Sequence, residues 1–354
     1  MKHIIPALLL VLFAAGCGQP HEDEVDALFS DFTGNRPGAS VMVVRDGRPV
    51  FVKSYGLAAL DDGAPATPET NYRLASVTKQ FTAMAVMILI ERGRLSLDNT
   101  LADIFTGFPA YGSAVTVRYL LTHTSGLVAY EDLMDPSDSR QVYDRDVLAM
   151  MASVDSTYFP PGTAYRYSNS GYAVLAMIVE RISGMSFPAF LDEHVFRTAG
   201  MKRSVAFVDG VNTVPNRAYG YALEGDGFVF SDQSTTSAVL GDGGIYTSVA
   251  DMFRWDQALY DGRLVSRSML ETAFTSTVLA DGSATRYGFG WNIGEYRGHR
   301  RVFHSGSTCG FRTAFHRYPD DHFAVIVLSN RRVANTDDLA ERLTDIFLME
   351  DNGE

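Results

Sequence analysis

Runs of apolar, β-branched residues near both ends of the chain predict β-strands. Residues 39–44 and 49–55 form two such runs, and the Asp46-Gly47 pair between them is typical of a two-residue hairpin turn. Towards the other end, polar turns separate four further runs, at residues 287–293, 302–305, 311–318 and 323–329. Strands from the two ends of the chain are therefore available to pair with one another.

Helical spacing of apolar residues flanks these strands and dominates the middle of the chain. Apolar residues recur at helical intervals over residues 25–32 and 336–349, and the run 81–90 is apolar enough for a buried helix. From about residue 95 to residue 240 the strand signals thin out and helical patterns replace them. We therefore predict an α/β (α+β) fold: an antiparallel sheet built from both chain ends, flanked by helices, with an inserted, mostly helical subdomain at 95–240.

The first residues are typical of an export signal. Lys2 supplies a positive start, residues 4–13 are apolar, and the small residues 14–16 directly precede Cys17. This arrangement resembles a bacterial lipobox, in which the cysteine thiol is lipidated and becomes the mature N-terminus. The alternative is an ordinary signal peptide in which Cys17 is incidental.

This interpretation divides the chain and places it outside the cytosol. Residues 1–16 form the predicted signal peptide, residues 17–24 the lipidated N-terminus with a polar tether, and residues 25–350 the folded domain. We expect a lipid anchor on the periplasmic face of a bacterial membrane. Gly18 stands where many inner-membrane lipoproteins of Gram-negative bacteria have aspartate, so the outer membrane is the expected destination in such a host.

Composition excludes several classes of protein. The 354 residues include 30 Lys and Arg against 42 Asp and Glu, a net charge of −12, and the sequence has no basic stripe to bind the phosphates of nucleic acid. The sequence also has no glycine-rich phosphate loop after a strand and no cysteine and histidine cluster with metal-ligand spacing, so we expect neither a cofactor nor a metal. Cys309 is the only cysteine besides Cys17, so an acylated Cys17 leaves no pair for an intrachain disulfide.

A serine and a lysine three residues apart lead into the apolar run at 81–90. On a helix Ser76 and Lys79 share one face, so the amine can reach the hydroxyl. A hydroxyl is a weak nucleophile until a nearby base removes its proton, and lysine becomes such a base only when burial or a helix N-terminus lowers its pKa. The apolar residues after Lys79 indicate that burial, which makes Ser76 the candidate nucleophile.

Two further segments carry groups suited to the same chemistry. Tyr167, in a turn-rich loop, is the only one of 17 tyrosines with an asparagine two residues later, Asn169. A phenol can relay a proton to a leaving group, and Asn169 can hold a substrate amide or the lysine. The segment His304-Ser305-Gly306-Ser307 ends a predicted strand, where Gly306 lets a ligand approach and an edge N–H can join that of Ser76 in an oxyanion hole. The alternative for Tyr167 and His304 is a structural role in packing.

In this order and spacing, the three motifs resemble those of the serine β-lactamase and penicillin-binding-protein superfamily, whose signature is Ser-x-x-Lys. Four blocks are similar to its class C-like branch, at residues 72–82, 117–127, 161–172 and 241–255. The resemblance covers nearly the whole chain after the signal peptide. It implies a β-lactamase/transpeptidase-like fold and a serine hydrolase that works through an acyl-enzyme.

The resemblance also implies a role for each motif residue. Ser76 is the nucleophile, and Lys79 and Tyr167 share the general-base and general-acid steps. The substrate-binding and oxyanion residues that it implies are Asn169, His304, Gly306 and Ser307, the last through its backbone N–H.

The third motif departs from that of penicillin-acting members. Those members usually have Lys-Thr-Gly or Lys-Ser-Gly, whose cation helps to hold a substrate carboxylate, whereas this chain has His304-Ser305-Gly306. Histidine is mostly neutral at pH 7, and His-x-Gly is typical of esterase-like and D-amino-acid-releasing relatives. Arg312 is positioned in the sequence to replace the cation if its side chain points into the site.

We therefore expect a carboxylesterase or a D-amino-acid peptidase with weak or no β-lactamase activity, acting on a small-molecule or peptidoglycan-derived substrate. Two alternatives stay open. One is a true class C-like β-lactamase, and the other is a penicillin-binding sensor lipoprotein that is acylated without turnover.

Overall fold

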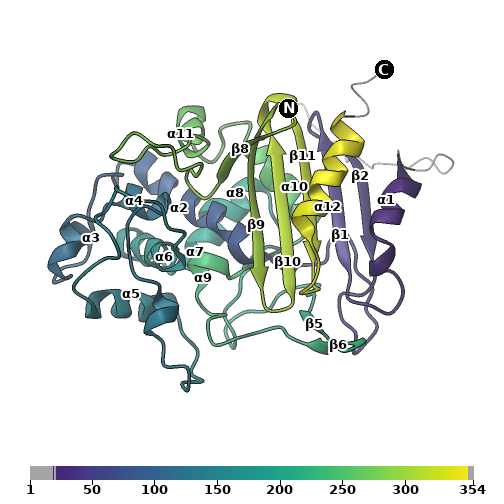
Figure 1. Ribbon diagram of the computed structural model, residues 1–354, viewed down its shortest axis with the longest axis horizontal. Helices are drawn as coiled ribbons and strands as arrows, with labels where there is room; N and C mark the ends of the chain where they lie inside the picture. The colour runs from purple at the N-terminus through teal and green to yellow at the C-terminus, as the bar shows by residue number, and fades with distance from the viewer. Residues whose placement is uncertain (1–18, 20, 350–354) are drawn as a thin grey trace, which may run out of the picture.

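Strands from both ends of the chain form one six-stranded antiparallel sheet (Figure 1). The computed structural model describes residue 19 and residues 21–349. Within these residues the strands lie in the spatial order β2 (Arg48–Tyr55), β1 (Ala39–Arg45), β11 (Phe323–Ser329), β10 (Phe311–Tyr318), β9 (His299–Thr308) and β8 (Asn292–Tyr296). Each neighbouring pair is antiparallel. The predicted fold class is confirmed.

Most predicted strands have their expected limits. The predictions at 311–318 and 323–329 coincide with β10 and β11, and the prediction at 302–305 lies inside the longer β9. The hairpin of β1 and β2 turns at Asp46-Gly47, where φ angles of 52° and 72° suit a two-residue turn.

The strand predicted at 287–293 is wrong in position, because β8 begins only at Asn292. Before it, Tyr287, Phe289 and Trp291 are at most 2% exposed. Their alternating pattern reflects aromatic side chains that fill the core from a loop, whereas the strand ladder starts afterwards. Periodicity alone does not separate these two cases.

Both faces of the sheet are buried, and they enter two different cores. In β1, Met42 and Val44 belong to the larger hydrophobic cluster, while Val41 and Val43 belong to the smaller one. Residues of β11 alternate in the same way. Successive side chains of a strand point to opposite faces, so a strand that is buried on both faces has a continuous apolar sequence.

Helices cover the two faces. The helices α1 (Glu22–Leu28) and α12 (Thr336–Thr344) contribute to the smaller core, and α10 (Val249–Ala258) packs from the opposite side against β1 and β11 (Figure 1). A 3₁₀ turn, Ser30–Phe32, follows α1, and a π-helical turn, Asp345–Met349, follows α12. The helices predicted at both ends of the chain are confirmed.

The other elements lie between β2 and β8 in the sequence. The helices described there, besides α10, are α2 (Lys79–Glu91), α3 (Leu101–Ile104), α4 (Val117–Leu121), α5 (Asp144–Ser153), α6 (Asn169–Ser183), α7 (Phe187–Phe190), α8 (Arg197–Ala199), α9 (Leu240–Gly243) and α11 (Arg267–Ala273). The short strands are β3 (Tyr72–Arg73), β4 (Val205–Ala206), β5 (Tyr221–Glu224), β6 (Gly227–Phe230) and β7 (Ile245–Thr247). Among the described helices, none alone has the length and apolar composition of a membrane span; α6 taken together with Phe187–Ala199, across a 76° bend, meets both criteria.

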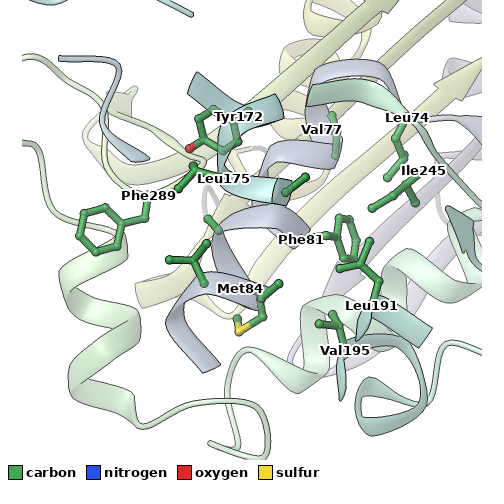
Figure 2. Close-up of a cluster of buried hydrophobic side chains, with 14 of the residues drawn as sticks. Leu74, Val77, Phe81, Met84, Tyr172, Leu175, Leu191, Val195, Ile245 and Phe289 are labelled. Atoms are coloured by element: carbon green, nitrogen blue, oxygen red, sulfur yellow. The ribbon is translucent and has the colours of Figure 1, made fainter. Parts of the chain in front are cut away.

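The helix α2 lies at the centre of the larger core. Every residue from Lys79 to Leu89 is buried. Figure 2 shows Phe81 and Met84 of α2 among side chains from other elements, including Leu175 of α6 and Ile245 of β7. A helix that is apolar on all sides is stable only when it is surrounded by protein. The first turn of α2, which carries the predicted catalytic lysine, is therefore fixed by the core.

Polar residues before residue 25 contact the sheet. Gln19 already pairs with β2, since its side chain donates to the Val52 carbonyl (3.0 Å) and accepts from the Val52 N–H (2.8 Å). Glu22, the first residue of α1, binds Lys53 at 2.7 Å. Two polar residues inside the predicted tether at 17–24, Gln19 and Glu22, therefore have partners on β2. The predicted limits of the signal peptide, the tether and the domain stay predictions. The predicted signal peptide and Cys17 lie outside the described residues.

The strand β9 packs closely against the turn that carries Ser76. The hydroxyl of Thr313, on the neighbouring strand β10, donates to the carbonyl of Leu74 at 2.7 Å. A Cβ atom at Gly306 would collide with both of these oxygens and would lie 3.1 Å from the Cβ of Ala75. Glycine is therefore required at position 306 by the close approach of two backbone segments.

We expect Gly306→Ala to destabilise the protein by about 1–3 kcal/mol, because the added methyl group has no space. The matched control is Gly294→Ala on β8, where a Cβ would meet only Phe303 at an ordinary 3.6 Å. Urea unfolding of both variants measures the difference. Equal unfolding midpoints for the two variants would contradict the packing described here.

Candidate active site

Ser76 lies on a strained turn directly before α2. The 3₁₀ turn Ala75–Thr78 runs into the first residue of α2, Lys79, and Ser76 is half-buried. Ala75 has a φ of 50°, in the left-handed region that residues other than glycine rarely adopt. The backbone of Leu74, directly before Ala75, is held by two hydrogen bonds. Its carbonyl accepts from the hydroxyl of Thr313, and its N–H donates to the carbonyl of Ile245 (2.8 Å). Backbone strain of this kind persists where the surrounding structure fixes it, often at functional sites.

The amine of Lys79 is fully buried and contacts three oxygens. Its Nζ lies 3.2 Å from Ser76 Oγ, 2.9 Å from Asn169 Oδ1 and 2.9 Å from the backbone carbonyl of Asp242. An uncharged amine has two N–H groups and one lone pair. The two carbonyl oxygens accept only, so they take the two N–H groups, and the lone pair is left for the hydroxyl hydrogen of Ser76.

Burial lowers the pKa of Lys79 below its ordinary value of 10.5. Two carboxylates, Asp242 and Glu131, oppose this shift through their charge. Desolvation is the larger effect because the amine is surrounded by protein on every side. The geometry and the desolvation of Lys79 thus both favour an uncharged amine that acts as a base.

Tyr167 completes the group around the serine. Its hydroxyl hydrogen-bonds to Ser76, and its ring centre lies 4.9 Å from Lys79 Nζ. Tyr167 borders an open cavity, and the residue is 39% exposed, whereas desolvation of its hydroxyl raises the pKa of that group above the ordinary value. Tyr167 is therefore a neutral phenol at physiological pH, able to donate a proton.

Asn169, at the N-terminus of α6, has both ends of its amide engaged. Its Oδ1 accepts from Lys79, and its Nδ2 donates to Oε1 of Glu131 at 2.9 Å. Glu131 lies on the 3₁₀ turn Tyr130–Leu133, whose first residue donates its hydroxyl to the carboxylate of Asp242 (3.3 Å). A chain of contacts therefore links the lysine to two acids that sequence analysis did not identify.

A third acid that sequence analysis did not identify, Asp144, holds α9 in place. It is buried at the start of α5, and its two carboxyl oxygens accept from the N–H groups of Leu240 (2.8 Å) and Gly241 (2.9 Å). Burial raises the pKa of Asp144 to about 8. Because α9 presents the carbonyl of Asp242 to Lys79, Asp144 acts on the amine through the backbone.

His304 is placed in the wall of the site, and protein groups occupy both of its ring nitrogens. Nε2 lies 3.0 Å from the hydroxyl of Tyr287, and Nδ1 lies 2.7 Å from the carbonyl of Ser305. Burial, aided by the charge of Lys79, lowers the pKa of His304 to about 4. The imidazole is neutral at pH 7 and has no free nitrogen for a substrate, so it shapes the wall and carries no charge.

The edge of β9 is open beside Ser76. The ladder between β8 and β9 ends at the pair Asn292 and Phe303, so no described strand pairs with β9 beyond that point on this side. Gly306 packs on the Ser76 turn, and Ser307 lies further along the same edge. The structure thus brings the third motif to the nucleophile through backbone contact.

Ser76 and Ser307 lie where two cavities meet. The larger cavity, of about 490 Å³, is bordered by Tyr167 and His304 among others. The smaller, of about 210 Å³, is bordered by Asn169 and by acidic residues. A substrate bound across Ser76 would therefore place one part in each cavity.

Arg312 borders the larger cavity. The sequence alone did not determine the direction of this side chain. Its Nη1 donates to the carbonyl of Phe311 (2.7 Å), and no carboxylate of the described residues lies within ion-pair distance of it. Cys309, by contrast, borders neither cavity. The part of the chain that the structure describes also contains no group of three or more Asp, Glu, His or Cys side chains placed to bind a metal.

Comparisons with known proteins agree on one family. The model of the Beta-lactamase family matches residues 25–347. Penicillin-binding protein 4* of Bacillus subtilis (strain 168) is 33% identical over 308 residues, which cover 82% of this chain and 68% of that protein. The D-aminopeptidase of Brucella anthropi is 30% identical over 318 residues, covering 88% of this chain and 59% of that protein. This chain thus spans 59% to 68% of the length of these two relatives.

Solved structures show the same architecture. The octameric penicillin-binding protein homologue from Pyrococcus abyssi has a TM-score of 0.81 at 28% identity, covering 92% of this chain and 77% of that chain. A class C beta-lactamase has a TM-score of 0.76 at 22% identity, covering 92% and 95%, a likeness of fold alone. With the family model matching almost the entire described chain, these relatives show that the protein belongs to the beta-lactamase family.

Proposed function

We propose that this chain is a serine hydrolase that cleaves amides or esters of D-amino acids through an acyl-enzyme on Ser76. The observation that carries the proposal is the contact of buried Lys79 Nζ with Ser76 Oγ at 3.2 Å, beside two carbonyl acceptors that can take both N–H groups of an uncharged amine. Membership of the beta-lactamase family and the similarity to a D-aminopeptidase support it.

In the first step, Ser76 Oγ attacks the substrate carbonyl carbon while its proton passes to Nζ of Lys79. The backbone N–H groups of Ser76 and Ser307 stabilise the oxyanion, where each such donor contributes about 2.7–4 kcal/mol in comparable enzymes. Both residues border the two cavities, as this role requires.

In the second step, the tetrahedral intermediate collapses and the leaving group departs. Tyr167 gives its phenolic proton to the leaving nitrogen or oxygen and takes a proton from the ammonium of Lys79, which becomes a neutral amine again. Its raised pKa keeps the proton on the phenol until the leaving group can accept it. Water then attacks the ester carbonyl, its proton passes to Lys79, and Ser76 Oγ is protonated as it leaves.

The larger cavity offers one cation, Arg312, to a leaving group with a carboxylate, and it is also bordered by the carboxylate of Asp337, which lies 3.1 Å from His316. Arg312 supplies an unpaired guanidinium there, while His304 is neutral. This is the pattern expected for an amino acid or peptide leaving group, including one derived from peptidoglycan. A class C-like β-lactamase and a penicillin-binding sensor without turnover remain the competing proposals.

We also propose that the protein is exported and anchored through a lipid on Cys17, as its first seventeen residues suggest. Only Gly18 separates Cys17 from Gln19, which contacts β2. We expect Cys17→Ser to move the protein from the membrane fraction to the soluble fraction, whereas Cys309→Ser stays in the membrane fraction. Equal membrane association of the two variants would contradict the anchor.

We expect Ser76→Ala to abolish labelling by a fluorophosphonate probe and to lower kcat/KM for D-alanine p-nitroanilide and p-nitrophenyl acetate by about 10⁴-fold or more. Ser113→Ala, at an exposed serine, is the control. Equal labelling of Ser76→Ala and wild type would overturn the proposal. Faster turnover of nitrocefin than of the D-alanine substrate would identify the protein as a β-lactamase instead. A mass adduct of a β-lactam on Ser76 that persists without turnover would identify it as a sensor.

We expect kcat/KM for p-nitrophenyl acetate to rise with pH through a midpoint well below 10.5. Burial lowers the pKa of Lys79, only the uncharged amine is a base, and protonation below that pKa removes it. Lys79→Arg should reduce the rate by about 10²-fold or more, since a guanidinium stays protonated. A rise of kcat/KM centred near the pKa of free lysine, or a Lys79→Arg variant that keeps its activity, would contradict the role of Lys79 as the base.

A further inference from the structure

We propose that Glu131 binds the protonated α-amino group of the substrate's acyl part and so selects small aminoacyl substrates with a free amine. This inference rests on the proposed function and names the substrate class for the same site. It assigns to the smaller cavity a ligand group that the catalytic steps do not require.

Glu131 lies on the wall of the smaller cavity. Its side chain borders the 210 Å³ cavity together with Ser76 and Asn169. Asn169 bridges Glu131 and Lys79 through its two amide ends, each at 2.9 Å. An acyl group bound to Ser76 and extending into this cavity therefore shares it with the Glu131 carboxylate.

The charge of Glu131 is unpaired. No Lys, Arg or His of the described residues lies within ion-pair distance of it, and its Oε2 receives no hydrogen bond from them. Glu131 is exposed and borders the cavity. A substrate ammonium would be the first ionic partner of this carboxylate, and charge-assisted hydrogen bonds are the stronger ones.

Arg73, a cation on the wall of the same cavity, already has hydrogen-bond partners within the protein. It is buried, and its guanidinium donates to the carbonyls of Gly243 (3.1 Å) and Ser237 (2.7 Å) and to the side-chain oxygen of Gln233 (3.1 Å). These partners are neutral and fix the cation in the wall. When Lys79 is uncharged, as the reaction requires, the wall has two carboxylates against one guanidinium, so an ammonium balances its charge.

Glu131 distinguishes a free amine from an N-acylated one. Asn169 uses its Oδ1 on Lys79 and one of the two N–H groups of its Nδ2 on Glu131. An N-acyl carbonyl could accept from the second N–H of Nδ2, but it is an acceptor and cannot pair with the Glu131 carboxylate, whereas an ammonium can. The cavity volume is also below the roughly 300–1,000 Å³ of pockets that hold drug-sized ligands, which fits an acyl part as small as alanine.

The test compares D-alanine p-nitroanilide with N-acetyl-D-alanine p-nitroanilide. We expect wild type to prefer the free amine by about tenfold or more in kcat/KM, and Glu131→Gln to reduce this ratio by about tenfold or more. Glutamine keeps an oxygen for Asn169 and removes the charge. Asp132→Asn is the matched control, because Asp132 lies on the same turn, binds Tyr158 (2.7 Å) and borders neither cavity; its ratio should stay within about twofold of wild type.

Each result decides the inference. An equal fall on both substrates in Glu131→Gln would mean that Glu131 only positions Asn169, and an unchanged ratio would mean that it does not contact the amine; either overturns the inference. Fluorophosphonate labelling of wild type separates this failure from failure of the proposed function. Labelling with an unchanged ratio rejects the Glu131 site alone, and absence of labelling rejects both.

Discussion

The burial of a single amine controls the chemistry of this site. Lys79 is enclosed by protein, and its two nearest oxygens apart from Ser76 belong to neutral carbonyl groups. Had these partners been carboxylates in direct contact, the amine would remain an ammonium and would have no lone pair for the serine. The nearby acids Asp242 and Glu131 act on it only through space or through Asn169.

Much of the fold maintains this arrangement. The core around α2 fixes the amine, α6 supplies Asn169, and the carbonyl of Asp242 comes from α9. That short helix is held in turn by Asp144 and by the hydroxyl of Thr82, which donates to the carbonyl of Gly241 at 2.7 Å. The sheet contributes through Gly306, whose lack of a side chain lets β9 reach the Ser76 turn. The active site is thus a meeting point of the two halves of the fold.

The sequence was most informative where one local pattern determines the structure. The continuous apolar runs of β10 and β11 and the Asp-Gly turn depend on neighbouring residues alone, and their limits were predicted correctly. The aromatic loop before β8 has a strand-like pattern for a different reason, because its side chains fill the core. Local periodicity reports burial in both cases and cannot tell which one applies.

The same distinction holds for the site. Ser76, Lys79 and Tyr167 stand in recognisable motifs, and the structure brings them together. Asp144 and Glu131 belong to no motif. Asp144 bonds to residues 96 and 97 positions away, and Glu131 to one 38 positions away, so their roles depend on contacts that only the folded chain creates.

The most direct test of this account is the protonation state of Lys79, measured by NMR on protein labelled with ¹³C at the lysine Cε. The sequence has only four lysines, Lys2, Lys53, Lys79 and Lys202, so the signals can be assigned by substitution. For Lys53, burial lowers the pKa, but hydrogen bonds to Asp26 and Glu22 outweigh it and raise the pKa overall, which makes Lys53 an internal reference. The account predicts that Lys79 titrates well below 10.5 while Lys53 titrates above it; a Lys79 that stays protonated up to the pH at which free lysine titrates would contradict it.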